Sequence, residues 1–259
     1  MRVSSSSLLV DRGPSAARGT SRAVRRGGAD VASALSSLAM CGRSSLHDAP
    51  VSVLESFGLP PIVRGFRPRY NIAPSQEQLT ISLTATGFVE ARHRRWGLVP
   101  PWAADESIGH RMVNARAETL TQKPSFRAPL RKQRCLIVAD GYYEWRKEGG
   151  RKIPVFFHLS GHRPFTIAGL WERWRRGPQP LDTCVIITTA ARGRAAEVHD
   201  RMPVIFPPEV AKRWIARESR AAEVMAMLSP YEDDDLELYD VAPAVNNPAY
   251  DMPDCISRT

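Results

Sequence analysis

The sequence has few cysteines, and none of them falls in a metal-binding or disulfide-rich pattern. No two of the four form a C-x-x-C pair, and no histidine lies at metal-ligand spacing from any of them. We therefore expect no structural zinc site and no disulfide scaffold, and this cysteine usage fits a reducing, cytoplasmic compartment. No run approaches eighteen apolar residues, so a membrane span is not expected either. The four are Cys41, Cys135, Cys184 and Cys255.

Residues 1–39 have no aromatic residue, and Asp11 and Asp30 are their only acids. A segment so rich in Ser, Ala, Arg and Gly cannot offset its ordering entropy by burial, so it is expected to be disordered. It fits an Arg- and Ser-rich transit peptide, a basic tail, or an extension upstream of the true start codon. We expect the last of these, with Met40 as the initiator and 40–259 as a single domain.

The formal net charge is +9, and arginine clearly outnumbers lysine. Such an excess favours a polyanionic partner such as nucleic acid, although an arginine-rich genome produces the same composition. The chain has no internal repeat. Its length and apolar content suit one good-sized core.

From residue 40 onward the patterns predict many strands and a few peripheral helices. A helix is expected over 50–57, ended by Gly58, and a hairpin turn over 148–151. Later helices are expected over 208–216 and 220–228. Cys135 and Cys184 fall in apolar strand-like runs and are expected to be buried thiols. The expected strands are 79–83, 88–99, 134–145, 153–159, 165–171 and 183–188.

Polar and glycine- or proline-rich segments interrupt these strands, as functional loops do when a sheet positions them. In order they are MCGR (40–43), RYNIAPSQ (69–76), RWGLVPPWA (95–103), NARAET (114–119), RCLIVADGYYEW (134–145), IAGLWE (167–172) and HDRMPVI (199–205). In this order and at these spacings they resemble the SOS response-associated peptidase family, whose members shield abasic sites in DNA. The resemblance runs from Met40 to about Asn247. It implies one α+β, mainly-β domain with a curved antiparallel sheet or barrel core.

The resemblance gives Cys41 the central role, provided that it is the first residue of the working protein. An N-terminal cysteine carries an α-amine, partly unprotonated near neutral pH, beside a thiol. The amine attacks the aldehyde of a ring-opened abasic deoxyribose, and the thiol then closes a five-membered thiazolidine. An internal cysteine cannot do this because its nitrogen is an amide. Without the resemblance, Cys41 would be interpreted as a small buried residue.

Three further residues receive catalytic roles from the resemblance. Glu144, expected to be partly buried among aromatic residues, is implied as the acid–base residue, although a surface strand carboxylate fits the pattern equally. His199 is implied as a proton shuttle that also reverses the crosslink, or else it holds a turn. Asn114 is implied to hold the open sugar, while asparagines in turns also serve conformation alone.

Five residues are expected to contact DNA. Arg43 and Arg116 suit phosphate binding, although surface arginines commonly form salt bridges. Asn71 is expected to orient the cysteine amine and hold the sugar, and Trp96 to form a wedge on which a base stacks. The resemblance places Thr189 at a family position near the DNA backbone or the site. Glu118 is given no role beyond a loop-stabilising salt bridge.

The leading hypothesis is a monomeric, nucleoid-associated crosslinker of abasic sites in single-stranded DNA that uses neither metal nor organic cofactor. The resemblance also implies autocatalytic removal of residues before Cys41 and lyase-like chemistry. Two alternatives remain open. One is a cysteine peptidase acting on other proteins through Cys41, His199 and Glu144, and the other is a non-catalytic single-strand binder that uses Arg and Trp side chains.

Overall fold

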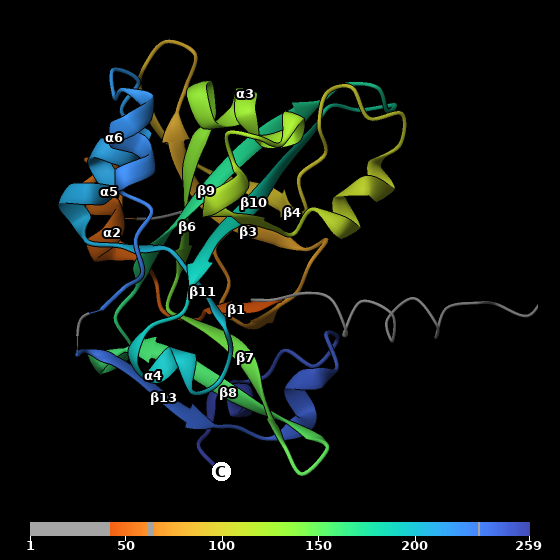
Figure 1. The fold of residues 1–259 in the computed structure, drawn as a ribbon, viewed down its shortest axis with the longest axis vertical. Helices are drawn as coiled ribbons and strands as arrows, with labels where there is room; N and C mark the ends of the chain where they lie inside the picture. The colour runs from red at the N-terminus through yellow and green to blue at the C-terminus, as the bar shows by residue number, and fades with distance from the viewer. Residues whose placement is uncertain (1–41, 62–64, 233) are drawn as a thin grey trace, which may run out of the picture.

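The computed structural model describes residues 42–61, 65–232 and 234–259. They form one α+β, mainly-β domain in which thirteen strands make two sheets with short helices around them (Figure 1). The expected fold class is therefore confirmed. Cys41 and the segment before it lie outside the described residues.

The larger sheet closes into a five-stranded barrel. Neighbouring strands pair in the order β4, β3, β6, β9, β10, and β10 pairs again with β4. The β10–β4 pair is parallel and the other four are antiparallel, so the expected antiparallel barrel holds with one exception. The barrel strands are β3 (Glu77–Leu83), β4 (Val89–Trp96), β6 (Arg134–Ala139), β9 (Phe165–Trp174) and β10 (Leu181–Ala190).

Three short strands extend the barrel. Near its C-terminal end, β10 lies between β5 (Asn114–Arg116), which pairs with it in parallel, and β11 (Arg201–Pro203), which pairs antiparallel. β12 (Ile205–Phe206) pairs with β9. The last residues of β10 thus have a short strand on each side.

The smaller sheet is antiparallel, with the strand order β13–β8–β7–β1–β2. Its central strands β7 and β8 are joined by the hairpin expected over 148–151, where Gly149 and Gly150 both have positive φ. The members are β1 (Arg43–Leu46), β2 (Arg69–Ile72), β7 (Gly141–Glu148), β8 (Arg151–Leu159) and β13 (Leu236–Asp240).

The run expected as one strand over 134–145 is two strands, and that prediction was wrong. The chain breaks at Asp140, leaving β6 in the barrel and β7 in the smaller sheet. The buried Asp140 carboxylate accepts hydrogen bonds from Ser45 and from the backbone N–H groups of His47 and Asp48. These bonds fix the corner where the chain passes from one sheet to the other.

The helices are short and lie at the periphery (Figure 1). The three expected helices are present as α2 (Val51–Ser56), α5 (Pro208–Ile215) and α6 (Ala221–Ala226). The patterns missed α3 (Pro124–Lys132), which has a proline at its first position and another inside it. α4 is Gly193–Ala196, and the 3-10 helices are η1 (Glu106–Arg111), η2 (Ala117–Thr119), η3 (Ser160–His162), η4 (Pro243–Asn246) and η5 (Pro253–Ile256).

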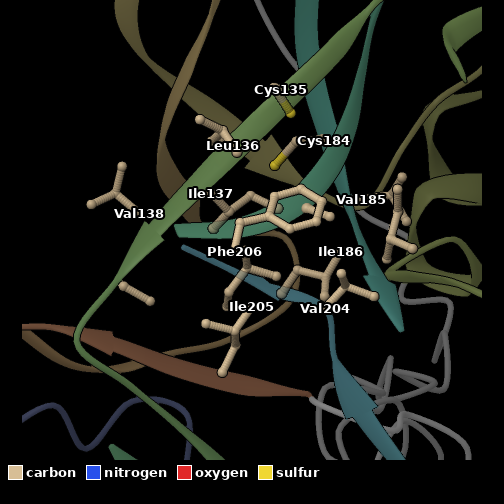
Figure 2. Packing of buried hydrophobic residues seen from close by; sticks show 14 of the residues in the cluster. Cys135, Leu136, Ile137, Val138, Cys184, Val185, Ile186, Val204, Ile205 and Phe206 are labelled. Carbon is tan, nitrogen blue, oxygen red and sulfur yellow. The ribbon is translucent and has the colours of Figure 1, made fainter. Parts of the chain in front are cut away.

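The main core lies in and around the barrel. All six residues of β6 are buried, and apolar side chains from β6, β10 and the β11–β12 segment pack together there (Figure 2). Cys135 and Cys184 belong to this core, as expected. Over the described ranges, no helix combines the length and apolar character required to cross a membrane.

Candidate functional site

Strand β1 brings the start of the family-like region against β7 and β2. Arg43 pairs with Tyr143, the residue before Glu144, and Ser44 pairs with both Tyr142 and Ile72. Antiparallel pairing therefore places Arg43, Asn71 and Glu144 in one part of the smaller sheet. We call these three residues the β1 group.

Glu144 is 2% exposed, which confirms the expected burial of this carboxylate. It lies on β7 opposite Val155 of β8. The preceding Tyr143 is also buried, and its hydroxyl donates to the carbonyl oxygen of Tyr70 at 2.6 Å. This bond ties β7 to β2 beside the carboxylate.

Arg43 is half-buried, and its guanidinium lies over the Trp145 ring at 5.8 Å from the centroid. One terminal nitrogen donates to the carbonyl oxygen of Asn246 at 3.3 Å, and among the described residues the buried Nε has no hydrogen-bond partner. Desolvation lowers the pKa of Arg43, an effect that Tyr143 and Cys255 partly offset. Arginine stays protonated nonetheless, so this is a partly desolvated cation with donors to spare.

Asn71 is fully buried, with 0% exposure. Its amide nitrogen lies within hydrogen-bonding distance of three backbone carbonyls, those of Val245, Asn247 and Tyr250, at 3.1, 3.1 and 2.7 Å. The side chain thus holds the C-terminal segment on β2 and presents no surface to DNA, so the predicted direct contact is wrong. Its Oδ1 has no partner within the described part of the chain, and a role in orienting the cysteine amine stays a prediction.

A second group gathers at the C-terminal end of β10. On one side Asn114 and Arg116 of β5 pair with Ile186 and Thr188, and on the other side Thr189 pairs with Met202 of β11. His199 lies two residues before β11 begins. Asn114, Arg116, Thr189 and His199 are the β10 group.

Asn114 has an unsatisfied amide. Both its Nδ2 and its Oδ1 are buried, and neither has a hydrogen-bond partner among the described residues. A buried amide left unpaired costs about 1 to 3 kcal/mol, so native proteins pair nearly all of them. An exception of this kind, located at the end of a strand, marks a place where a ligand can supply the missing partners.

The two ring nitrogens of His199 have different surroundings. Nδ1 lies 3.1 Å from the backbone N–H of Arg201 and 2.8 Å from a carboxylate oxygen of Asp200. It cannot accept from the first and donate to the second at once. When Nδ1 accepts from Arg201, the ring proton lies on Nε2, which is then a donor.

Glu118 and Arg201 form a two-point salt bridge of 2.7 and 2.9 Å between η2 and β11. The hydrogen bond from Arg201 is the main cause that lowers the pKa of Glu118. The salt bridge that the sequence analysis considered for Glu118 is therefore present. Arg116 is exposed and free to meet an anion, while Thr189 is buried.

The predicted base-stacking wedge at Trp96 is wrong. Trp96 is 1% exposed and its indole N–H donates to the carbonyl oxygen of Val113 at 2.8 Å, so no base can reach the ring. The exposed aromatic of this segment is Trp102, at 53%. Its neighbour Ala103 accepts from the Trp174 indole N–H at 2.8 Å, which fixes the loop that presents it.

Sequence reasoning also missed the C-terminal loop, residues 245–251. Besides holding Asn71, this loop contacts Trp145, whose indole N–H donates to Oδ1 of Asn246 at 2.7 Å. Trp145 is half-buried. The turn-forming sequence Asn246-Asn247-Pro248 was the available signal, but it does not indicate which strands the turn will meet.

The described residues contain no group of three or more His, Cys, Asp or Glu side chains arranged to hold a metal ion. The β1 and β10 groups supply amides, a carboxylate, an imidazole and guanidinium groups.

Comparison with known proteins gives consistent matches. The family described as "SOS response associated peptidase (SRAP)" matches residues 40–248. "Abasic site processing protein YoqW" of Bacillus subtilis (strain 168) is 42% identical over 222 residues, covering 84% of this chain and 99% of the relative. "Abasic site processing protein HMCES" of Gallus gallus is 32% identical over 188 residues, covering 62% of this chain and 55% of that longer protein.

A solved structure of a Bacteroides thetaiotaomicron protein superimposes with a TM-score of 0.75 at 26% identity, covering 85% of this chain and all of its own. A phage-related protein of Bordetella bronchiseptica gives a TM-score of 0.64 at 30% identity, covering 78% of this chain and 94% of its own. The mainly-β architecture is thus shared with experimentally determined structures.

Proposed function

Since the chain belongs to the SOS response-associated peptidase family, we propose that it captures abasic sites in single-stranded DNA as a covalent adduct on Cys41. Three relatives that each match more than half of this chain are named abasic site processing protein. The proposed partner is single-stranded DNA with an abasic site. The proposed chemistry needs no metal, because both bond-forming atoms belong to one residue.

The reaction is a condensation that releases one water. The Cys41 amine adds to the aldehyde carbon of the open deoxyribose, and loss of water gives an imine. The thiol then adds to the same carbon, its sulfur forming the second bond while the proton goes to nitrogen. The product is a thiazolidine, and the reverse sequence releases the lesion.

The observation that supports this proposal best is the register between β1 and β7. Arg43 faces Tyr143, so the chain enters the sheet beside the buried Glu144. Cys41 precedes Arg43 by two residues, which limits their Cα separation to about 7 Å. The buried Glu144 carboxylate and the partly desolvated Arg43 guanidinium are suited to proton transfer and to phosphate binding, which supports their proposed roles.

The remaining roles follow from the side chains. Glu144 moves the protons of ring opening and dehydration. Asn114, with both amide atoms unpaired among the described residues, binds a sugar hydroxyl, and Nε2–H of His199 donates to the sugar or ring nitrogen. Arg116 binds a neighbouring phosphate, and Thr189 lies near the DNA backbone.

The active form is proposed to begin at Cys41, whether translation starts at Met40 or the preceding residues are removed autocatalytically. A thiazolidine cannot form on an acylated nitrogen. Consequently, any mature chain with residues attached before Cys41 has to be inactive in crosslinking.

The test uses protein expressed from Met40 and single-stranded DNA with one abasic site. We expect a slow band on a denaturing gel whose intact mass equals protein plus DNA less one water. Cys41→Ser should give no stable adduct, and undamaged DNA should give none with either protein. Absence of the band from protein with a verified N-terminal cysteine overturns the proposal, and cleavage of added polypeptides without an adduct would favour the peptidase alternative.

A further inference from the structure

The C-terminal loop is fastened to the β1 group at several points. The Asp251 carboxylate accepts from the backbone N–H groups of Tyr70 and Asn71, at 2.6 and 2.8 Å, along the open edge of β2. It also forms an ion pair with Arg69. Together with the three carbonyls bound by Asn71, these contacts hold the loop in one conformation beside Arg43.

Within this loop, Asn246 makes polar contacts with both Arg43 and Trp145. Its side-chain Oδ1 accepts from the Trp145 indole N–H at 2.7 Å, and its backbone carbonyl accepts from Arg43 at 3.3 Å. Arg43 in turn lies over the Trp145 ring. The three residues form a closed triangle of contacts, which we call the Arg43 clamp.

We infer that Asn246 is a positioning residue that fixes the Arg43 guanidinium for a phosphate next to the lesion. This inference rests on the proposed function, because it assigns Arg43 to the DNA. The bond to Asn246 uses one terminal nitrogen and the Trp145 ring covers one face, so the remaining donors keep a single orientation. A guanidinium recognises phosphate through its planar fork of donors, and recognition therefore depends on that orientation.

The side-chain amide of Asn246 controls this geometry indirectly. Removing it by Asn246→Ala leaves the backbone carbonyl in the chain but releases the ring that Arg43 rests on. The neighbouring Asn247 offers a matched control, because its Oδ1 accepts only from the backbone N–H of Ala249 among the contacts of the described chain. Asn247→Ala therefore tests the general effect of shortening an asparagine in the same loop.

The first measurement is equilibrium affinity for undamaged single-stranded DNA, which requires no thiazolidine chemistry. Loss of one charge-assisted contact predicts about fivefold weaker binding by Asn246→Ala and by Trp145→Phe, with little change for Asn247→Ala. In an Arg43→Ala background, Asn246→Ala should have no further effect, because the residue acts through the guanidinium. Thermal unfolding of each variant accompanies the binding data.

The second measurement separates binding from chemistry. At saturating abasic DNA the crosslinking rate of Asn246→Ala should equal that of the parent, while at low DNA concentration it should fall by the factor seen in affinity. Equal weakening by Asn246→Ala with and without Arg43, equal weakening by Asn247→Ala, or unchanged affinity would overturn the inference. If no variant or parent forms an adduct but the affinity pattern holds, the proposed function fails and the positioning role stands.

Discussion

The barrel interior and the β10 group both bury polar side chains, but they differ in how many of those polar atoms have hydrogen-bond partners. In the barrel, Arg94 is 1% exposed, and its terminal nitrogens donate to Thr80, Ser82 and Glu90. Its guanidinium also lies over the Trp171 ring, 4.5 Å from the centroid. Only Nε lacks a partner among the described residues. This arginine is held by the protein itself.

Asn114 shows the opposite arrangement, since neither amide atom has a partner in the described chain. Asn71 is intermediate: its amide nitrogen donates to backbone carbonyls, and its amide oxygen has no hydrogen-bond partner among the described residues. Polar groups satisfied by the fold contribute to stability, whereas groups left unpaired cost stability and are retained where a ligand completes them. The comparison therefore predicts which substitutions affect folding and which affect DNA.

The largest expected effect is a difference in thiol reactivity between the two barrel cysteines and Cys41. Desolvation raises the pKa of Cys135 to about 12 and that of Cys184 well above its usual value, so both stay protonated inside the core. At pH 8 we expect an alkylating reagent to modify Cys41 of the folded Met40-start protein at least about 1000-fold faster than either barrel thiol. Intact mass and peptide mapping measure this, and unfolding in denaturant should equalise the rates. Rapid labelling of Cys135 in the native state would contradict the closed barrel.

The second prediction tests whether the hydrogen bonds and ion pair of buried Arg94 stabilise the barrel. Arg94→Met removes the cation from Glu90 and leaves two buried hydroxyls without their donor, which should cost about 3 kcal/mol of unfolding free energy. Urea denaturation measures the loss. The folded fraction should still crosslink abasic DNA at the parental rate. A variant of unchanged stability would show that the network contributes nothing.

The third prediction reverses that pattern. Asn114→Ala removes an unpaired buried amide, so stability should be unchanged or higher, while crosslinking of abasic DNA should fall about tenfold to 100-fold. Single-turnover rates and urea midpoints on the same preparation separate the two effects. Asn71→Ala is the contrasting variant, because losing its bonds to the C-terminal loop should lower stability as well. Equal losses of stability in both variants would remove the distinction.

The sequence alone predicted the architecture well and the surroundings of the site poorly. Strand patterns indicated a mainly-β domain, because apolar alternation is a local signal. The segments around Cys41 and Glu144 carried the family resemblance, which implied the same fold class. The same patterns did not separate buried Trp96 from exposed Trp102, which lie in one short segment. That distinction depends on Val113 and Trp174, to which no local pattern points.

Long-range partners were the other limit. Asn71 was correctly singled out, but its partners lie 174 to 179 residues away along the chain. The short strands β1, β2 and β13 and the proline-containing α3 also went unpredicted, because their stability comes from distant neighbours rather than from propensity. The sequence can therefore identify the polar residues of a site, but it does not identify the distant residues that they contact.

The smallest expected effect concerns a histidine cluster at the other end of β1. The His158 and His162 rings stack at 3.9 Å, and His47 lies 6.3 Å from His162. Desolvation, with the charges of His158 and His47, lowers the pKa of His162 despite the opposing carboxylates of Asp140 and Glu237. A histidine whose folded pKa lies below its unfolded value favours unfolding when it is protonated.

Stability contributed by the neutral His162 ring is therefore lost as the pH falls from the unfolded value toward the folded one. His162→Asn removes this penalty and suits the backbone, since φ is +54° at this position and asparagine tolerates the left-handed region. Between about pH 7.5 and about pH 5 the variant should lose less stability than the parent, by under about 1 kcal/mol. His47→Asn should do the opposite, because the hydrogen bond and charge of Asp140 outweigh desolvation and raise the pKa of His47. Urea midpoints across that pH range measure the stability of both variants. The two histidines of the cluster are predicted to respond to acid in opposite directions. If both substitutions changed the pH dependence of stability in the same direction, the predicted pKa directions would be wrong.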